Sequence, residues 1–316
     1  MASVAATSAH DPCIHVDLDQ LRRLGSQART LTFLPRQPAA SVLNGRHASK
    51  LRGRGLNFEE LREYVDGDDI RTMDWKVTAR TGKPHVRVYT EERDRPTLLI
   101  VDQRMSMYFG SRVFLKSVIA AEAAALAAHR VLAQGDRIGG LVFGDEVIAE
   151  HRPARSHKAL NQVLTSIAKA NALLHADAPV AAALPLNKVL RSALRIAKTN
   201  ALIMVFSDFD GTDDQTDALI AALARSNDLI LFNIADPLAD GIPADLRMTV
   251  TDGHLQAELN TGDGKVHQRL RDMLQGRAAI VQTWSRKYGV PVLPLTTVEP
   301  AADQIRQLLG HGRVPR

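Results

Sequence analysis

The sequence predicts an α/β protein with a doubly wound, mostly parallel β-sheet. From about residue 96 onward, short apolar runs alternate with helical patterns. Unbroken apolar runs are typical of strands that are buried on both faces. These runs lie at residues 97–101, 138–143, 201–206 and 228–234. Strands that alternate with helices form right-handed crossovers, which give a parallel sheet covered by helices on both faces.

The remaining elements follow from helical periodicity and from breaker residues. Ser111 is placed to cap the first predicted helix, and Gly135 is placed to end it. Residues 146–152 predict an antiparallel strand beside 138–143. Residues 290–295 predict a final strand, whose two prolines place it at an edge of the sheet. The predicted helices cover residues 112–134, 157–171, 186–198, 213–226 and 300–309.

The chain divides into three parts by character. Residues 1–40 form an N-terminal segment of helix and loop, in which residues 17–33 are predicted to be helical. Residues 41–95 form a charged segment, and residues 96–312 form the sheet domain. The first 95 residues are too few and too polar for a large core of their own, so we expect them to pack on the sheet domain.

Composition excludes several classes of protein. The 316 residues are 45% hydrophobic and 24% charged, which is an ordinary globular balance. A single cysteine, Cys13, excludes a disulfide framework. No apolar run reaches the ~20 residues that a membrane span requires. We therefore expect a soluble cytoplasmic protein that does not insert into membranes.

The net charge of +5 raises the question of nucleic-acid binding. The basic residues do not form one block, apart from the run at residues 46–54, which leads directly into an acidic stretch. Adjacent blocks of opposite charge are typical of a protein-docking surface rather than of a phosphate track. Nucleic-acid binding through 46–54 stays a hypothesis beside the two that are given at the end of this subsection.

Several enzyme motifs are incomplete. Residues 110–117 imitate a phosphate-binding loop, but Leu115 replaces the glycine before Lys116. Residues 208–213 resemble a calcium loop, but Leu219 stands where the bidentate glutamate belongs. The sequence has no G-x-S-x-G nucleophile elbow. We therefore expect no catalysis.

Two carboxylates end two of the predicted strands. Asp102 follows 97–101, and Asp208 follows 201–207. If these strands are neighbours, the two side chains converge at one edge of the sheet, where α/β folds bind ligands. The alternative interpretation is that each aspartate caps a following helix.

The residues around these carboxylates resemble a known domain. Residues 101–107 resemble the Asp-x-Ser-x-Ser metal motif of von Willebrand factor A domains, and residues 207–211 resemble the later aspartate loop of that fold. Residues 53–80 resemble the signature of domain of unknown function 58, whose members join it to an A-type domain. The resemblance implies a von Willebrand factor A-like, Rossmann-type fold. It also implies a partner, because these proteins are commonly encoded beside MoxR-type AAA+ ATPases.

The metal motif is degenerate in this chain. Arg104 stands where the first serine is expected, and residues 172–190 contain no serine or threonine where a third hydroxyl is expected. The resemblance implies Asp102, Ser106 and Asp208 as the ligands of any Mg²⁺ that binds weakly. We expect no cofactor, and we expect Arg104 to replace the metal by contacting Asp102, Asp208 or both. The predicted degenerate metal site or partner face consists of Asp102, Arg104, Ser106, Asp208 and Asp210.

The signature segment supplies a second set of candidates. We expect Tyr64 and Trp75 to be largely buried against the sheet domain. Gly67 to Asp69 reads as a turn in which an aspartate bonds the backbone. Buried ion pairs that fix how the segment docks are expected between two sets of residues, namely Arg62, Arg71 and Arg80 against Glu63, Asp69 and Asp74. The predicted signature surface consists of Arg62, Tyr64, Asp68, Asp69, Arg71, Asp74, Trp75 and Arg80.

The sequence therefore predicts a non-catalytic protein-interaction module. Its expected role is that of an adaptor or co-chaperone of a MoxR-type AAA+ ATPase, in the assembly or maturation of a protein complex. The alternative is a hydrolase that uses a cleft between Asp102 and Asp208. That reaction needs a nucleophile and a base, and the segments expected to line the cleft contain no histidine.

Overall fold

The computed structural model describes residues 11–29, 31, 56–66, 68, 70–91, 95–176, 183–239, 241, 247–251 and 256–310. It consists of two compact units, which are described separately below. One unit combines residues 1–33 with 95–316 and is called the sheet unit; the other spans 34–94 and is called the signature unit. The basic run 46–54 and Asp69 lie outside the described residues.

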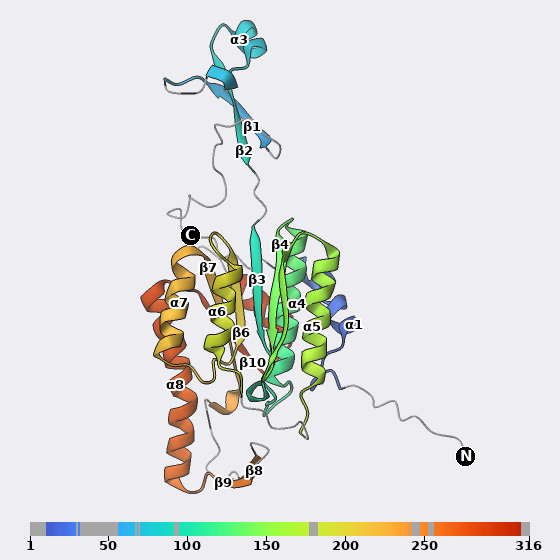
Figure 1. Cartoon of the computed structure of the whole chain (residues 1–316), viewed down its shortest axis with the longest axis vertical. Coiled ribbons are helices and arrows are strands. Elements are labelled where there is room, and N and C mark those ends of the chain that lie inside the picture. Colours follow the sequence, from blue (N-terminus) through green and yellow to red (C-terminus); the bar gives the residue numbers. More distant parts are fainter. Residues whose placement is uncertain are drawn as a thin grey trace, which may run out of the picture. The chain divides into compact units, whose positions relative to one another are not determined.

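The sheet unit is built on six strands in the order β10-β7-β6-β3-β4-β5 (Figure 1). All neighbouring strands pair in parallel except β4 and β5, which are antiparallel. This confirms the predicted fold class, including the antiparallel companion and the proline-containing edge strand. The strands are β3 (Pro96–Asp102), β4 (Arg137–Phe143), β5 (Val147–Ala154), β6 (Leu202–Ser207), β7 (Asp228–Ala235) and β10 (Val292–Thr296).

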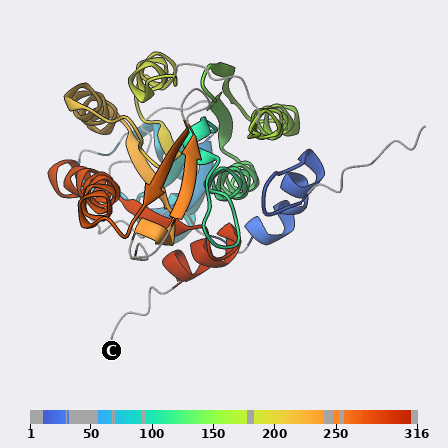
Figure 2. The same ribbon diagram turned by 90° about the horizontal axis from the view of Figure 1, so that it is seen from below.

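Helices cover both faces of this sheet (Figure 2). One face carries α4 (Lys116–Ala133), α5 (His157–Ala172) and α9 (Ala301–Gly310). The other face carries α6 (Leu186–Ile196), α7 (Asp214–Ser226) and α8 (Gly264–Tyr288). The short helices α1 (Leu18–Arg23) and α2 (Gly25–Ala28) pack outside α4, and α1 also touches α5.

The two cores follow from strand periodicity. Successive side chains of a strand point to opposite faces, so Leu99 and Val101 enter the core with α4, while Leu98 and Ile100 enter the core with α6. All four are fully buried. Helix α4 is buried on nearly every side, and its many alanines let the sheet, α5 and α9 approach it closely.

Two parts of the sheet unit differ from the sequence prediction. Helix α4 begins at Lys116 instead of residue 112, and Ser111 does not cap it, because the Ser111 hydroxyl donates to Asp236 Oδ1 at 2.5 Å. Residues 247–288 were not predicted to contain regular structure. They form the hairpin of β8 (Arg247–Thr251) and β9 (Gln256–Asn260), followed by α8. Helix α8 has an Asp263 N-cap and a left-handed Gly289 at its end, signals that could have identified it.

The signature unit contains a two-stranded antiparallel sheet of β1 (Leu56–Glu63) and β2 (His85–Glu91). The connection between the strands contains η2 (Ile70–Thr72) and α3 (Trp75–Thr81). Asp74 caps α3 by accepting from the backbone amides of Lys76 and Val77. Among the described side chains of this unit, Asp74 and Val86 alone are buried, so its described part has no large apolar core.

In the described part of the chain, no helix is both long enough and apolar enough to cross a bilayer.

Two further short elements follow strands of the sheet. They are the 3-10 helices η3 (Met105–Met107), directly after β3, and η4 (Pro237–Ala239), directly after β7.

Candidate functional site

The two predicted carboxylates lie at the carboxyl ends of neighbouring strands. β3 and β6 pair in parallel, with Val101 opposite Phe206, so the next residues of both strands meet at one edge of the sheet. Asp102 is fully buried and Asp208 is 5% exposed. β3 and β6 are therefore neighbours, as the predicted convergence of Asp102 and Asp208 requires.

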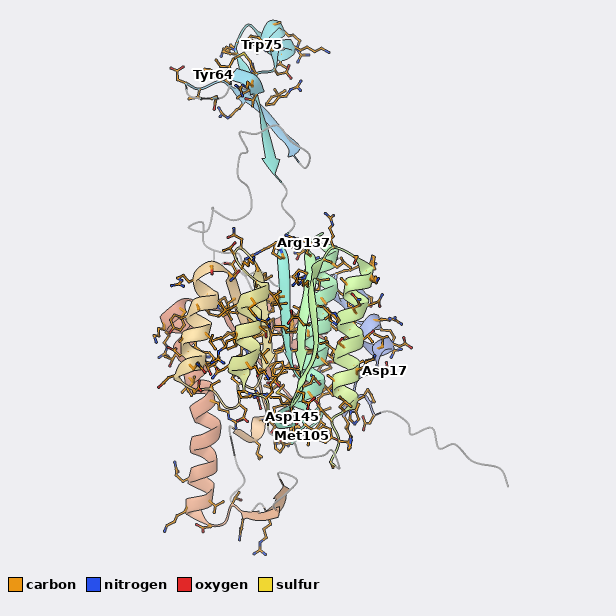
Figure 3. All side chains as sticks on the ribbon, in the orientation of Figure 1. Asp17, Tyr64, Trp75, Met105, Arg137 and Asp145 are labelled. Carbon is orange, nitrogen blue, oxygen red and sulfur yellow. The ribbon has the colours of Figure 1, made fainter. Side chains whose placement is uncertain are left out.

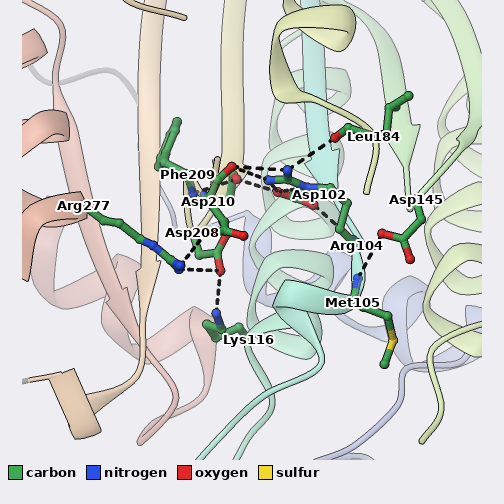
Figure 4. A network of polar contacts seen from close by, with 11 residues as sticks. Asp102, Arg104, Met105, Lys116, Asp145, Leu184, Asp208, Phe209, Asp210 and Arg277 are labelled. Atoms are coloured by element: carbon green, nitrogen blue, oxygen red, sulfur yellow. Dashed lines mark hydrogen bonds and ion pairs between the residues drawn. The ribbon is translucent and has the colours of Figure 1, made fainter. Parts of the chain in front are cut away.

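Arg104 binds Asp102 through two nitrogens of its guanidinium, Nε and Nη2 (Figure 4). Nε lies 3.0 Å from Oδ1, and Nη2 lies 2.7 Å from Oδ2. This is the planar, bidentate geometry that makes arginine–carboxylate pairs strong. The predicted contact between Arg104 and Asp102 is confirmed, whereas Arg104 is connected to Asp208 only through their charges.

The rest of the guanidinium is also satisfied. Nη2 lies 3.2 Å from the carbonyl oxygen of Asp210, and Nη1 lies 3.4 Å from that of Leu184. Burial opposes the charge of this side chain, which is 3% exposed. Attraction to Asp102, with smaller contributions from the other two aspartates, outweighs burial and raises the pKa of Arg104 above its ordinary value. Arg104 is therefore a permanent positive charge inside the site.

A serine connects the two strand ends. The Ser207 hydroxyl donates to Asp102 Oδ2 at 2.6 Å and accepts from the Phe209 amide at 2.9 Å. Phe209 has φ of 55°, the left-handed region that non-glycine residues rarely adopt. This turn brings the Asp210 amide to Asp208 Oδ1 at 3.1 Å. Asp102 and Asp208 thus bond their own loops rather than capping α4 and α7, whose caps are Leu115 and Asp213.

Asp208 is neutralised from two helices. Lys116 Nζ, at the start of α4, lies 2.5 Å from Asp208 Oδ2. Arg277, from α8, lies 3.7 Å from the same oxygen and pairs with Asp210. Burial alone would raise the pKa of Asp208, but the charges of Lys116, Arg104 and Arg277 lower it below its usual range. The three carboxylates thus meet three cations, and we call these six residues the strand-end network.

Sequence reasoning missed Lys116 and Arg277. Lys116 occupies the first turn of a helix, where the macrodipole disfavours a cation, and that misfit is a signal for a specific anionic partner. Arg277 could not be placed, because α8 was not predicted. Nothing in the local pattern around Arg277 indicates Asp208 or Asp210, since that pairing depends on how α8 packs.

The strand-end network does not fit a divalent cation. Mg²⁺ needs about six oxygen ligands with octahedral geometry. The oxygens of Asp102 are bonded by Arg104 and Ser207, and those of Asp208 by Lys116 and its own loop. Ser106 Oγ is buried without a hydrogen-bond partner, but a single serine hydroxyl supplies one of the roughly six oxygens that Mg²⁺ needs. Within the described residues, no three His, Cys, Asp or Glu side chains are grouped to hold a metal.

The strand-end edge also carries most of the exposed apolar side chains. The described part of the sheet unit exposes eight large apolar side chains. Ile280 and Leu308 lie on helices α8 and α9. We call the other six the strand-end rim. Three of them follow β3, one follows β10, one lies at the end of α5, and Ile14 is next to Cys13, which is bonded to Leu115. They are Ile14, Met105, Phe109, Val113, Leu173 and Val298.

The ion pairs that the structure describes for Arg62 and Asp74 differ from those predicted, whereas the predicted partner Asp69 lies outside the described residues. Arg62 binds Asp68 through both nitrogens at 2.7 and 2.8 Å, and Asp68 also accepts from the Val65 amide. Asp74 pairs with Arg87, not with a predicted partner. These arginines are 40% and 47% exposed, so the pairs are not buried. Asp68 does form the predicted turn contact.

Trp75 is not buried within the signature unit, and its predicted burial against the sheet domain stays a prediction. Trp75 begins α3 and is 66% exposed, while Tyr64 is half-buried (Figure 3). Among the side chains of this unit that the structure describes, Val86 alone is apolar and buried, so little apolar surface is available there for a ring. Arg71 and Arg80 are also exposed. The large exposed apolar side chains in the described part of the signature unit, which we call the signature patch, are Leu61, Val65, Ile70 and Trp75.

Comparisons with known proteins agree with the sequence resemblance. The family model described as "Protein of unknown function DUF58" matches residues 60–280. Relatives include the uncharacterised proteins Mb1516 of Mycobacterium bovis and Rv1480 of Mycobacterium tuberculosis. Each is 28% identical, over 98% of this chain and 97% of the relative.

Solved structures with similarity to this chain include von Willebrand factor A domains. BatB from Bacteroides thetaiotaomicron is 12% identical over 68% of this chain and 96% of that chain, with a TM-score of 0.42. The SpRpn10 VWA domain is 14% identical over 71% of this chain and 100% of that chain, with a TM-score of 0.36.

Proposed function

The chain belongs to the family of proteins of unknown function DUF58, and from its site we propose that it is a non-catalytic protein-interaction module. The observation that carries this proposal is the strand-end edge, which has six exposed apolar side chains and a charge-balanced network. Exposed apolar side chains that gather in one region are typical of protein-binding sites. A network whose charges are already paired presents no free charge to a small ionic substrate.

The proposed partner is a MoxR-type AAA+ ATPase, and the proposed role is that of an adaptor or co-chaperone in the assembly of a protein complex. The resemblance of residues 53–80 to the family signature supports this partner. The signature patch would supply a second contact area. Aromatic side chains such as Trp75, which is 66% exposed, are frequent hot spots in interfaces.

The hydrolase alternative has less support. Ser207 is the hydroxyl nearest to the two aspartates in the hydrogen-bond network, but it is fully buried and donates to Asp102. Both oxygens of Asp102 already accept hydrogen bonds from the Arg104 guanidinium, so Asp102 is poorly placed to take a proton from Ser207. A serine nucleophile needs a base within hydrogen-bond reach and access to substrate.

Capture from native lysate tests the partner. The tagged full chain should recover an AAA+ ATPase, and recovery should change when ATP is added. A variant with Val113→Asp and Trp75→Ala, which changes both exposed patches, should recover much less. Equal recovery by parent and variant, or no ATPase in either, would contradict the proposal.

A hydrolysis assay tests the absence of catalysis. The purified chain should turn over neither ATP nor generic esters and phosphoesters. Turnover that is lost in Asp102→Ala would replace the interaction module with the hydrolase.

A further inference from the structure

The segment before and within the first two helices contacts the loop that carries Arg104. We call residues 11–29 the N-terminal strap and residues 103–115 the strand-end loop. The strap is far from the loop in sequence, and three separate contacts join them. Each contact lies beside a residue of the strand-end network or of its rim.

The first contact is a buried side-chain bridge. The Val16 amide donates to Asn171 Oδ1 at 2.8 Å, and Asn171 Nδ2 donates to Gln103 Oε1 at 2.9 Å. Gln103 in turn donates through Nε2 to the carbonyl oxygen of Ser117 at 3.0 Å. Asn171 and Gln103 are 0% and 1% exposed. Because Gln103 directly precedes Arg104, the bridge fixes the backbone from which the guanidinium extends.

The other two contacts lie farther along the loop. The Leu115 amide donates to the carbonyl oxygen of Cys13 at 3.0 Å, and Leu115 directly precedes Lys116. The His15 ring lies 5.9 Å from the ring of Tyr108, and His15 Nδ1 lies 3.3 Å from the carbonyl oxygen of Asn171. The strap therefore contacts the middle and the end of the strand-end loop directly and reaches its beginning through Asn171.

The strap is itself anchored on α4. Gln20 Nε2 donates to Glu122 Oε1 at 3.1 Å, and His129 Nε2 lies 3.1 Å from the carbonyl oxygen of Leu21. Leu21 is fully buried and Ala28 is 1% exposed. A segment that buries apolar side chains and satisfies polar groups of its neighbours is a structural brace rather than a loose tail.

We propose that the N-terminal strap positions the strand-end loop, with Asn171 and Gln103 as the positioning residues. When the strap is docked, the strand-end loop holds Arg104, Lys116 and the rim in the arrangement that binds a partner. When the contacts are lost, the loop opens while the sheet stays folded. The part of this inference that concerns partner binding rests on the proposed function, whereas the ordering of the loop does not.

Amide hydrogen exchange on the full chain tests the ordering directly. The amides of Met107 and Tyr108 are bonded within the strand-end loop and report on its opening. Asn171→Ala removes the bridge, and His15→Ala removes a partly exposed contact. Arg22→Ala is the matched control, because Arg22 Nε bonds Asn161 Oδ1 at 3.2 Å near the opposite end of α5.

We expect loop amides to exchange about tenfold faster or more in Asn171→Ala. A smaller acceleration is expected in His15→Ala and none in Arg22→Ala, while β3, β6 and α7 keep the parent's rates. Unchanged loop exchange in Asn171→Ala would overturn the proposal. Equal acceleration throughout the sheet unit would also overturn it, because that result indicates general destabilisation. If Asn171→Ala does not fold, His15→Ala decides by the same criterion.

The effect of the strap on partner binding is tested with the same variants in the ATPase capture assay. Asn171→Ala and His15→Ala should recover less ATPase than Arg22→Ala does. If the parent captures no ATPase, the proposed function fails, and the exchange rates still decide whether the strap orders the loop. If the loop opens but capture is unchanged, the proposed control of partner binding is wrong.

Discussion

Arg104 lies against Asp102 through two hydrogen bonds, from Nε to Oδ1 at 3.0 Å and from Nη2 to Oδ2 at 2.7 Å. Both side chains are almost completely buried, at 4% and 0% side-chain exposure. The chain thus provides its own cation at the end of β3. Two buried carboxylates at one sheet edge would repel each other, and this guanidinium, with Lys116 and Arg277, offsets their charge.

Removing that cation should strongly destabilise the sheet unit. Arg104→Ala leaves Asp102 buried without its partner, and breaking a buried pair on one side costs about 3–5 kcal/mol. Denaturant unfolding of parent and variant measures the loss. Arg306→Ala is the control, because Arg306 and Asp303 are both 51% exposed and such pairs contribute about 0–1 kcal/mol. Similar losses in the two variants would contradict a structural role for the buried pair.

The stability of the network should depend on pH in a defined direction. The pKa of Asp208 is lowered in the folded state, so its stabilisation is complete above the pKa of the unfolded chain, about 3.9. It is lost as pH falls through the lower folded value. Stability attributable to Asp208 should therefore be flat from pH 7 to 5 and decline in acid.

Comparison with Asp208→Asn isolates this contribution. The free energy of unfolding, measured from pH 7 downward, should fall less steeply in acid for the variant than for the parent. Asp303→Asn, at an exposed pair, should keep the parent's profile. A parent whose acid slope matches that of Asp208→Asn would show that the ionised Asp208 contributes nothing.

The strand-end rim should matter for binding but not for folding. Val113 is 51% exposed in the rim, and Val113→Asp should change the free energy of unfolding by no more than about 0.5 kcal/mol. It should weaken ATPase binding about tenfold or more, since a buried interface charge without a partner costs at least 1.4 kcal/mol. Ile280→Asp alters a 41% exposed side chain on α8 and should leave binding unchanged. Equal weakening by both variants would exclude the rim as the specific contact.

Trp75 gives the corresponding test for the signature patch. Because its ring is 66% exposed, Trp75→Ala should leave the unfolding free energy within about 0.5 kcal/mol of the parent. A loss of about 3–5 kcal/mol would instead show that the ring is a core residue. If the patch is a hot spot, titration of the ATPase should show binding weakened by about 2 kcal/mol or more.

Sequence patterns predicted the sheet because its strands are continuous apolar runs, and a run such as 201–206 has few alternative interpretations. They predicted the Arg104–Asp102 pair because the two residues are close in the chain and opposite in charge. Helix α8 has a low content of apolar residues, so periodicity did not reveal it. Arg277 was missed with it. A lone aromatic residue in a polar segment carries no information on what covers it, so the sequence did not indicate that Trp75 is exposed within its own unit.

Calorimetric titration of the parent chain with Mg²⁺ and Mn²⁺ tests most directly whether the chain's own cations, instead of a metal ion, neutralise the carboxylates of the strand-end network. Because Arg104, Lys116 and Ser207 bond the carboxylate oxygens that a metal would need, the parent should show no saturable binding. Arg104→Ser restores a hydroxyl beside Asp102, and any metal binding gained should appear in that variant alone. Tight, saturable binding by the parent would contradict the account.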